Sequence, residues 1–140
     1  MVVIAVEKVK GNQIGRAYAQ SIDHASAEGL KPFFEKYIDS GNARVFTEGW
    51  RGYWPLENEF EIKQKPSNGG KGFPGLYVVI MNLKGWLRGI HHHCSARFIN
   101  GYLDEFFFRF NRRNFLTTIW HKPIDRFMIT KSYVYGGNAI

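Results

Sequence analysis

The segment of residues 77–113 constrains the fold of this chain more than any other part of the sequence. Its second half, YLDEFFFRFNRR, places four phenylalanines and three arginines within twelve residues. In a helix, the positions four, seven and eleven residues after Ile99 share one face, and they hold Leu103, Phe106 and Phe110. The spacing therefore predicts an amphipathic helix whose apolar stripe forms part of the core.

The other side of this predicted helix is basic. It carries Arg109, Arg112 and Arg113. Glu105 lies one turn before Arg109, a spacing at which the two side chains form an ion pair within a helix. The helix is thus expected to bury aromatic rings on one side and present guanidinium groups on the other.

The first part of the chain predicts a hairpin followed by a helix. Residues 1–9 are rich in β-branched side chains, residues 14–22 alternate in polarity, and Lys10–Asn12 supplies a turn between them. The helix begins after an N-cap that is either Asp23 or Ser26. We expect the two strands to pair with each other.

The remaining elements are predicted from shorter signals. We expect the strand after the first helix to join the sheet of the hairpin, and the chain to be loose from Gly136 onward. The predicted elements are a helix end at residues 40–41, strands at 43–46 and 60–64, a glycine-rich loop at 65–75, a helix at 82–92 broken by Gly89, and a last helix within 114–132.

Composition narrows the class of protein. The net charge of +7 and the pI of about 9.6 favour an anionic partner, with nucleic acid as the first candidate and an ordinary solvated cationic surface as the alternative. The length of 140 residues suits one domain. Cys94 is the single cysteine, which excludes an intramolecular disulfide and fits a reducing compartment. No apolar run approaches the roughly 20 residues that span a bilayer, so we expect a cytoplasmic protein with no membrane partner.

Four segments carry a resemblance to a known family. NLKGWLRGIHH, YLDEFFFRFNRR and TEGWRGY resemble the patterns N-L-K-x-W-L-x-G-T-H-H, Y-L-x-E-F-x-F-R-F-N-R-R and T-D-G-W-x-G-Y of the ISXO-like group of DDE transposases of bacterial insertion sequences. GRAYAQSIDHASAEGL is similar to a further run of that family. The chain departs from the patterns at Glu48, Ile90 and His93, where the family has aspartate, threonine and glycine.

The resemblance implies an α/β fold, with an RNase H-like mixed sheet and flanking helices. It covers residues 1–132 as a partial transposase domain and leaves residues 133–140 as a loose C-terminal tail. The family's first strand has no counterpart after Met1, so we expect an N-terminally truncated domain with its first strand missing.

The family's chemistry implies a set of catalytic positions. Its members cut and rejoin DNA with two Mg²⁺ ions that acidic side chains hold. The first aspartate belongs to the missing strand, and Glu48 occupies the second position as a metal ligand. At the third position, Tyr77 lies seven residues before Lys84 and shares its helix face, although a phenol is a poor metal ligand at neutral pH. Asn82 lies only two residues before Lys84 and points to nearly the opposite side. The candidate catalytic residues are Glu48, Tyr77, Asn82 and Lys84.

The basic residues of the two motifs are candidate DNA contacts, with an ordinary solvated surface as the alternative. A zinc site at the three consecutive histidines is not favoured, because neighbouring residues of regular structure cannot converge on one ion and no second Cys/His cluster exists. The candidate nucleic-acid contacts are Lys84, Arg88, His91, His92, Arg109, Arg112 and Arg113.

These features are interpreted as a transposase fragment whose parent cleaves and transfers DNA at the inverted repeats of its element. We expect catalysis by this chain to be absent or very weak, with Glu48 facing Lys84 across a shallow basic cleft. Two alternatives stay open, a DNA-binding remnant that interferes with full-length transposase and a relic without function. The implied partners are inverted-repeat DNA and, in a homo-oligomer or hetero-oligomer, a second copy or full-length transposase.

Overall fold

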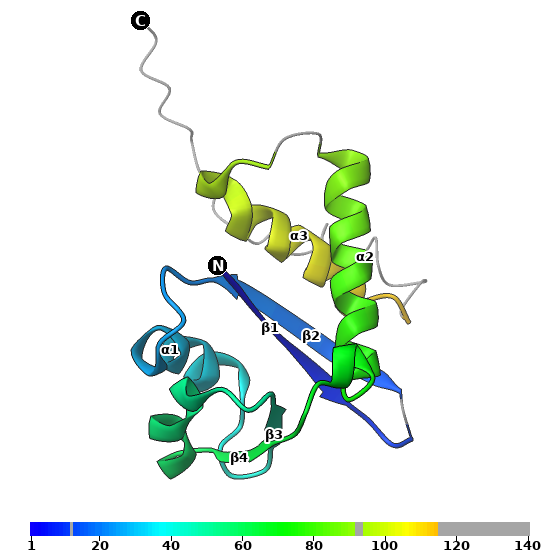
Figure 1. Cartoon of the computed structure of the whole chain (residues 1–140). Helices are drawn as coiled ribbons and strands as arrows, with labels where there is room; N and C mark the ends of the chain where they lie inside the picture. Colours follow the sequence, from blue (N-terminus) through cyan, green and yellow to red (C-terminus); the bar gives the residue numbers. More distant parts are fainter. Residues whose placement is uncertain (12, 92–93, 115–140) are drawn as a thin grey trace, which may run out of the picture.

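The computed structural model describes residues 1–11, 13–91 and 94–114. The β1–β2 hairpin lies between two helical layers, with α1 on one side and α2 and α3 on the other (Figure 1). In chain order the elements are β1 Val2–Lys8, β2 Ile14–Ser21, α1 Ala27–Tyr37, β3 Arg44–Thr47, the 3-10 helix η1 Arg51–Asn58, β4 Glu61–Gln64, the 3-10 turn η2 Asn68–Gly70, α2 Pro74–Ile90, the 3-10 turn η3 Ala96–Phe98 and α3 Ile99–Asn111.

The predicted hairpin is confirmed. β1 and β2 pair antiparallel, and one further pair extends the ladder, because the Met1 ammonium donates to the Ile22 carbonyl at 3.0 Å and the Ile22 N–H donates to the Met1 carbonyl at 2.8 Å. Successive side chains point to opposite faces of the hairpin. Val3 and Ala5 of β1 therefore pack on the cluster around α1, whereas Ile4 and Val6 pack on the cluster of α2 and α3.

α1 has the N-cap that one of the two predictions named. The Ser26 hydroxyl accepts a hydrogen bond from the Gly29 N–H at 3.1 Å, which satisfies one of the free donors of the first turn. The helix ends at Tyr37, before the predicted end at residues 40–41. A turn takes over there, in which the Asp39 carboxylate accepts from the Gly41 N–H at 3.1 Å.

The prediction that the strand at residues 43–46 joins the hairpin is wrong. The strands of the described residues form two separate two-stranded sheets, β1–β2 antiparallel and β3–β4 parallel. Side-chain packing on α1, rather than edge-to-edge hydrogen bonding, holds the sheets together. The shared cluster contains Leu30, Phe33 and Phe34 of α1, with Val3 and Ala5 from β1 and Val45 and Ile62 from the second sheet.

α2 is longer than predicted. It begins at Pro74 rather than near Asn82, and it continues through Gly89 to Ile90 without the predicted break. Proline is tolerated in the first turn because the N–H it lacks has no partner there. Gly89 lowers helix propensity by about 1 kcal/mol, which packing of the helix offsets. The glycine-rich stretch before Pro74 contains η2, where Asn68 and Gly69 have positive φ values of 46° and 63°.

α3 confirms most of the predicted stripe. Leu103 and Phe106 are buried, Ile99 and Phe110 are partly buried, and Phe107, outside the predicted stripe, is buried as well. The predicted helix within residues 114–132 and the predicted loose tail lie outside the described residues, apart from Asn114. Among the helices of the described ranges, none is long and apolar enough to cross a membrane. The described chain is thus a mixed α/β structure with small sheets and several helices.

Candidate functional site

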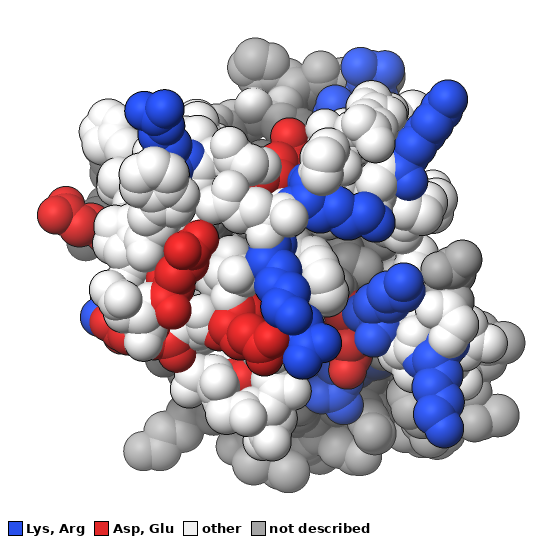
Figure 2. Space-filling view, turned by 60° about the horizontal axis from the view of Figure 1, so that its bottom comes forward, with Lys and Arg blue, Asp and Glu red and all other residues white. Residues whose placement is uncertain are grey.

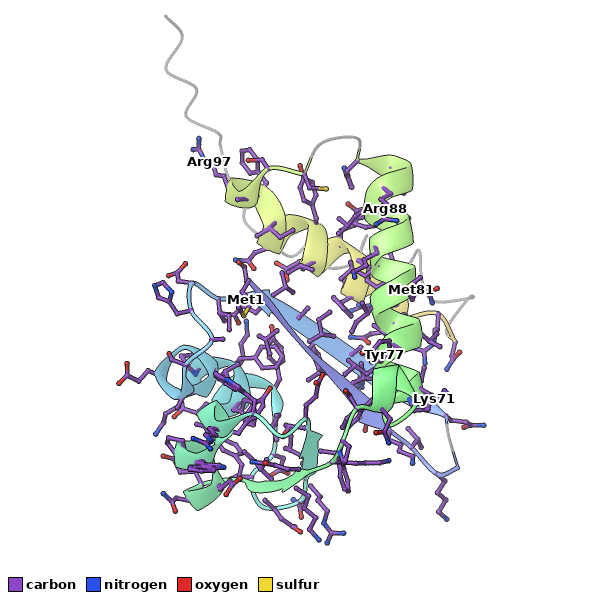
Figure 3. All side chains as sticks on the ribbon, in the orientation of Figure 1. Met1, Lys71, Tyr77, Met81, Arg88 and Arg97 are labelled. Atoms are coloured by element: carbon purple, nitrogen blue, oxygen red, sulfur yellow. The ribbon has the colours of Figure 1, made fainter. Side chains whose placement is uncertain are left out.

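α2 presents the candidate residues of the second motif on its exposed surface. Because the helix runs unbroken from Pro74, the seven-residue spacing of Tyr77 and Lys84 lies within one regular helix. Tyr77, Asn82, Lys84 and Arg88 are all exposed. Figure 3 shows the side chains of Tyr77, Met81 and Arg88 distributed along this helix. The structure keeps these positions accessible to a ligand.

A shallow hollow of about 410 Å³ lies towards the C-terminal end of α2. Its lining includes an ammonium, a guanidinium and an imidazole, which are donors that suit a phosphate oxygen. The cations also offset the partial negative charge of the last helical carbonyls. The residues that line the hollow are Lys84, Leu87, Arg88, His91 and Cys94.

His91 is held by aromatic rings. Its imidazole lies 4.9 Å from the ring of Trp86 and 4.4 Å from that of Tyr102, measured between ring centroids. Its Nε2 atom is buried and has no hydrogen-bond partner among the described residues. His91 therefore contributes packing at the end of α2, and its contact with DNA stays a prediction. His92 lies outside the described residues.

The three arginines of α3 have different surroundings. Arg109 makes the predicted ion pair, with its Nη2 at 2.8 Å from Glu105 Oε1. The Arg112 guanidinium lies 3.5 Å from the centre of the Phe108 ring and donates to the Phe108 carbonyl at 3.1 Å. Both side chains are near the surface, where a phosphate can reach them.

Arg113 has a structural role that the sequence did not indicate. Its guanidinium donates to the carbonyls of Ile14 and Gly15 at the start of β2, and to the Phe110 carbonyl at 2.9 Å. It also lies 4.1 Å from the centre of the Phe110 ring. These contacts hold the end of α3 against β2 and occupy donors that would otherwise bind DNA.

Glu48 follows β3 directly and is exposed. The side chain lies close enough to Tyr53 to affect it: burial, and then the charge of Glu48, raise the pKa of the Tyr53 phenol. The Trp50 indole packs over Gly52, where a Cβ would overlap the ring, and it meets Tyr53 edge-on at 5.2 Å between centroids. The glycine and the aromatic residues of this motif thus form a packed turn beside Glu48.

The residues around Glu48 do not fit a Mg²⁺ site. Within the described ranges, no three His, Cys, Asp or Glu side chains come together. Lys84 lines two hollows on α2, and Glu48 lines neither of them. A single exposed carboxylate does not displace the hydration shell that Mg²⁺ retains strongly. No metal-dependent step is therefore derived for this site.

The charges are divided unevenly along the chain. Residues 23–61, which contain α1 and η1, hold eight acidic and four basic residues, whereas residues 63–113, which contain α2 and α3, hold nine basic and two acidic residues. Figure 2 shows this separation on one face of the molecule, where acidic side chains predominate on the left and basic side chains on the right. A polyanion is therefore attracted to the side of α2 and α3.

The sequence alone did not indicate Leu87 or Cys94 as part of the hollow. Helical spacing could have located Leu87, because it lies three residues after Lys84 and four before His91. Cys94 lies beyond the end of α2, where no periodicity applies, and its Sγ is 4.0 Å from the His91 carbonyl.

Comparison with known proteins agrees with the motifs. The family model described as the ISXO2-like transposase domain matches residues 1–111. No curated protein and no solved structure matches the chain. The match extends over both helical layers and both sheets, from β1 to the last residue of α3. The chain therefore belongs to the ISXO2-like transposase domain family.

Proposed function

We propose that this chain is a DNA-binding part of a transposase domain, which binds DNA through α2 and the end of α3 and does not cleave it alone. The observation that carries the proposal is the hollow on α2, where Lys84 and Arg88 lie one turn apart and exposed. Two cations at this spacing match successive phosphate contacts, and the excess of basic residues in α2 and α3 extends the attraction beyond the hollow.

The lack of cleavage is supported by the surroundings of Glu48. Two-metal strand cleavage needs several carboxylates around a pair of ions. Glu48 is exposed, and the described residues gather no cluster of three potential ligands. Tyr77, Asn82 and Lys84 supply a phenol, an amide and an ammonium, none of which replaces a carboxylate in binding Mg²⁺ at neutral pH.

The division into two sheets supports the proposal that the chain is part of a larger domain. β1 and β3 pack on the same α1 cluster but do not pair with each other. Two sheets that share one helix without joining are what the loss of an intervening strand leaves behind. In this proposal the missing strand carries the first acidic ligand, and the chain competes with full-length transposase for the same inverted repeats.

DNA binding is tested by fluorescence anisotropy with two duplexes of equal length, one an inverted-repeat end of the element and the other a shuffled sequence. We expect both to bind at low salt, and the inverted repeat to bind more tightly. The double variant Lys84→Ala, Arg88→Ala should weaken binding. The matched control Lys36→Ala, Arg51→Ala removes the same charge from the acidic part of the chain and should change binding much less. Equal losses in the two variants would contradict the proposed interface.

Cleavage is tested separately with supercoiled plasmid in Mg²⁺ or Mn²⁺. We expect no nicking beyond the level without metal. Nicking that requires metal and disappears in Glu48→Ala would refute the proposal, because it would show that Glu48 acts with a further ligand. A chain that binds DNA and does not nick it is consistent with a DNA-binding remnant, whereas a chain that does neither is consistent with a relic.

A further inference from the structure

The two outer edges of the hairpin are treated differently by the fold. On β2, α3 side chains cap the backbone groups that point away from β1. Asn111 binds both the N–H and the carbonyl of Ala17, at 2.7 and 2.8 Å, and the Asn100 Oδ1 accepts from the Ser21 N–H at 2.8 Å. Such caps prevent another strand from pairing with an exposed edge.

β1 has no such protection. Because Met1 and Ile22 exchange hydrogen bonds, the alternation of an antiparallel ladder directs the backbone groups of Val2, Ile4 and Val6 away from β2. Within the described part of the chain, no hydrogen bond outside the β1–β2 ladder reaches these groups. The run from Val2 to Val6 also contains no charge and no proline, the usual blocks to edge pairing.

An apolar groove of about 310 Å³ lies beside this edge. Apart from Lys84, its lining is aliphatic, and it comes from three elements that surround the start of β1. The lining consists of Val2 and Ile4 of β1, Ile80, Leu83 and Leu87 of α2, and Ile99 and Leu103 of α3. Free backbone donors and acceptors next to an empty apolar groove are the requirements for strand addition.

The room beside β1 is limited on its far side. The α3 caps close the outer edge of β2, while β3 lies on the same α1 cluster as β1 through Val45, opposite Val3 and Ala5. A second copy that paired through its own β1 would bring β2 with it and would meet β3. A single strand avoids this, with one face on the groove and the other on the α1 cluster, so its side chains must be apolar on both faces.

We propose that the outer edge of β1 binds one extended, uncharged, apolar segment of another polypeptide as an added strand. Backbone hydrogen bonds to Val2, Ile4 and Val6 supply the affinity, and alternate side chains that fill the groove supply the preference for aliphatic residues. DNA does not suit this edge, because the groove is aliphatic apart from a single ammonium.

The test uses the full chain and a fluorescent peptide with the sequence of residues 1–8, which is apolar on both faces and brings no second strand. We expect saturable binding by anisotropy, together with slower amide hydrogen exchange at Val2, Ile4 and Val6 when the peptide is present. Val2→Lys should weaken binding at least tenfold, because a lysine at the edge opposes pairing. The matched control Val9→Lys, at an exposed position one residue past β1, should change binding less than twofold.

A peptide carrying Ile4→Pro, tested against the unaltered protein, should not bind, which keeps the test valid if Val2→Lys disturbs folding. Equal binding by the Val2→Lys and Val9→Lys proteins would overturn the proposal. Slow exchange at the three β1 amides before peptide is added would also overturn it. In a monomer that result would assign the edge to another part of this chain, and in a dimer to a second copy.

Discussion

Asn111 uses both halves of its side-chain amide on Ala17: its Oδ1 accepts from the Ala17 N–H at 2.7 Å, and its Nδ2 donates to the Ala17 carbonyl at 2.8 Å. The two residues are 94 positions apart, and Ala17 is completely buried. The last turn of α3 is therefore fixed to the outer edge of β2 by a pair of bonds that imitates a neighbouring strand.

Asn111→Ala should destabilise the fold by about 1–3 kcal/mol, because it leaves a buried N–H and a buried carbonyl without partners. The measurement is the urea midpoint at constant slope. Asn100→Ala is the matched control, since it removes a single bond to the exposed Ser21 N–H and should cost less. A larger loss for Asn100→Ala than for Asn111→Ala would show that the cap on Ala17 is not an important contact.

The role of Asn111 shows what the sequence could not indicate. The stripe of α3, the hairpin and the Glu105–Arg109 pair depend on spacings of a few residues, and each was predicted correctly. Asn111 lies among arginines, and its partner is distant in sequence, so that no local pattern distinguishes a cap from a solvent-exposed amide. Arg113 is a similar case, because its carbonyl partners also lie on β2.

The same distinction applies to the sheets and to the candidate site. A strand pattern identifies β3 but not its partner, because pairing depends on which edges meet after α1 has packed. Pro74 falls within the predicted loop, because the glycines before it mask the start of a helix. At the site, Lys84 and Arg88 follow from helical spacing, whereas Cys94 depends on the path of the chain after α2.

Phe106→Ala should destabilise the fold by roughly 3–5 kcal/mol, as truncation of a core aromatic residue does. Phe106 is buried and packs against three other aromatic rings, those of Trp86, Phe107 and Phe110. Phe98→Ala is the control, because Phe98 is 56% exposed and its removal should change stability by less than about 0.5 kcal/mol. A shift of under about 1 kcal/mol for Phe106→Ala would mean that α3 is not a core element.

The salt dependence of DNA binding should report the phosphate contacts of α2. Removing one cation that binds a phosphate reduces the slope of log K against log salt by about 0.9, so the double variant Lys84→Ala, Arg88→Ala should lower the slope by roughly 2. Arg109→Ala should have a smaller effect, since its guanidinium is already paired with Glu105 at 2.8 Å. Binding that does not depend on salt would contradict a phosphate-binding role for this face.

The titration of Tyr53 should report the charge of Glu48. Burial, and then the charge of Glu48, raise the pKa of the Tyr53 phenol, so folding favours the protonated form. This contribution to stability is fully present below the ordinary pKa of about 10 and is lost as the pH rises above it, because the unfolded phenol releases its proton first.

Glu48→Gln removes the smaller of the two causes, so the pKa of Tyr53 should fall but stay above its ordinary value. The measurement is the ¹³Cζ chemical shift of labelled tyrosine between pH 8 and 12, recorded at one ionic strength. Glu57→Gln is the matched control, because it removes the same charge from η1, and Glu57 is not among the causes of the shift at Tyr53. If both variants lower the pKa of Tyr53 equally, Glu48 has no specific contact with this phenol. The position of Glu48 beside the packed turn, on which its separation from other carboxylates depends, would then be wrong.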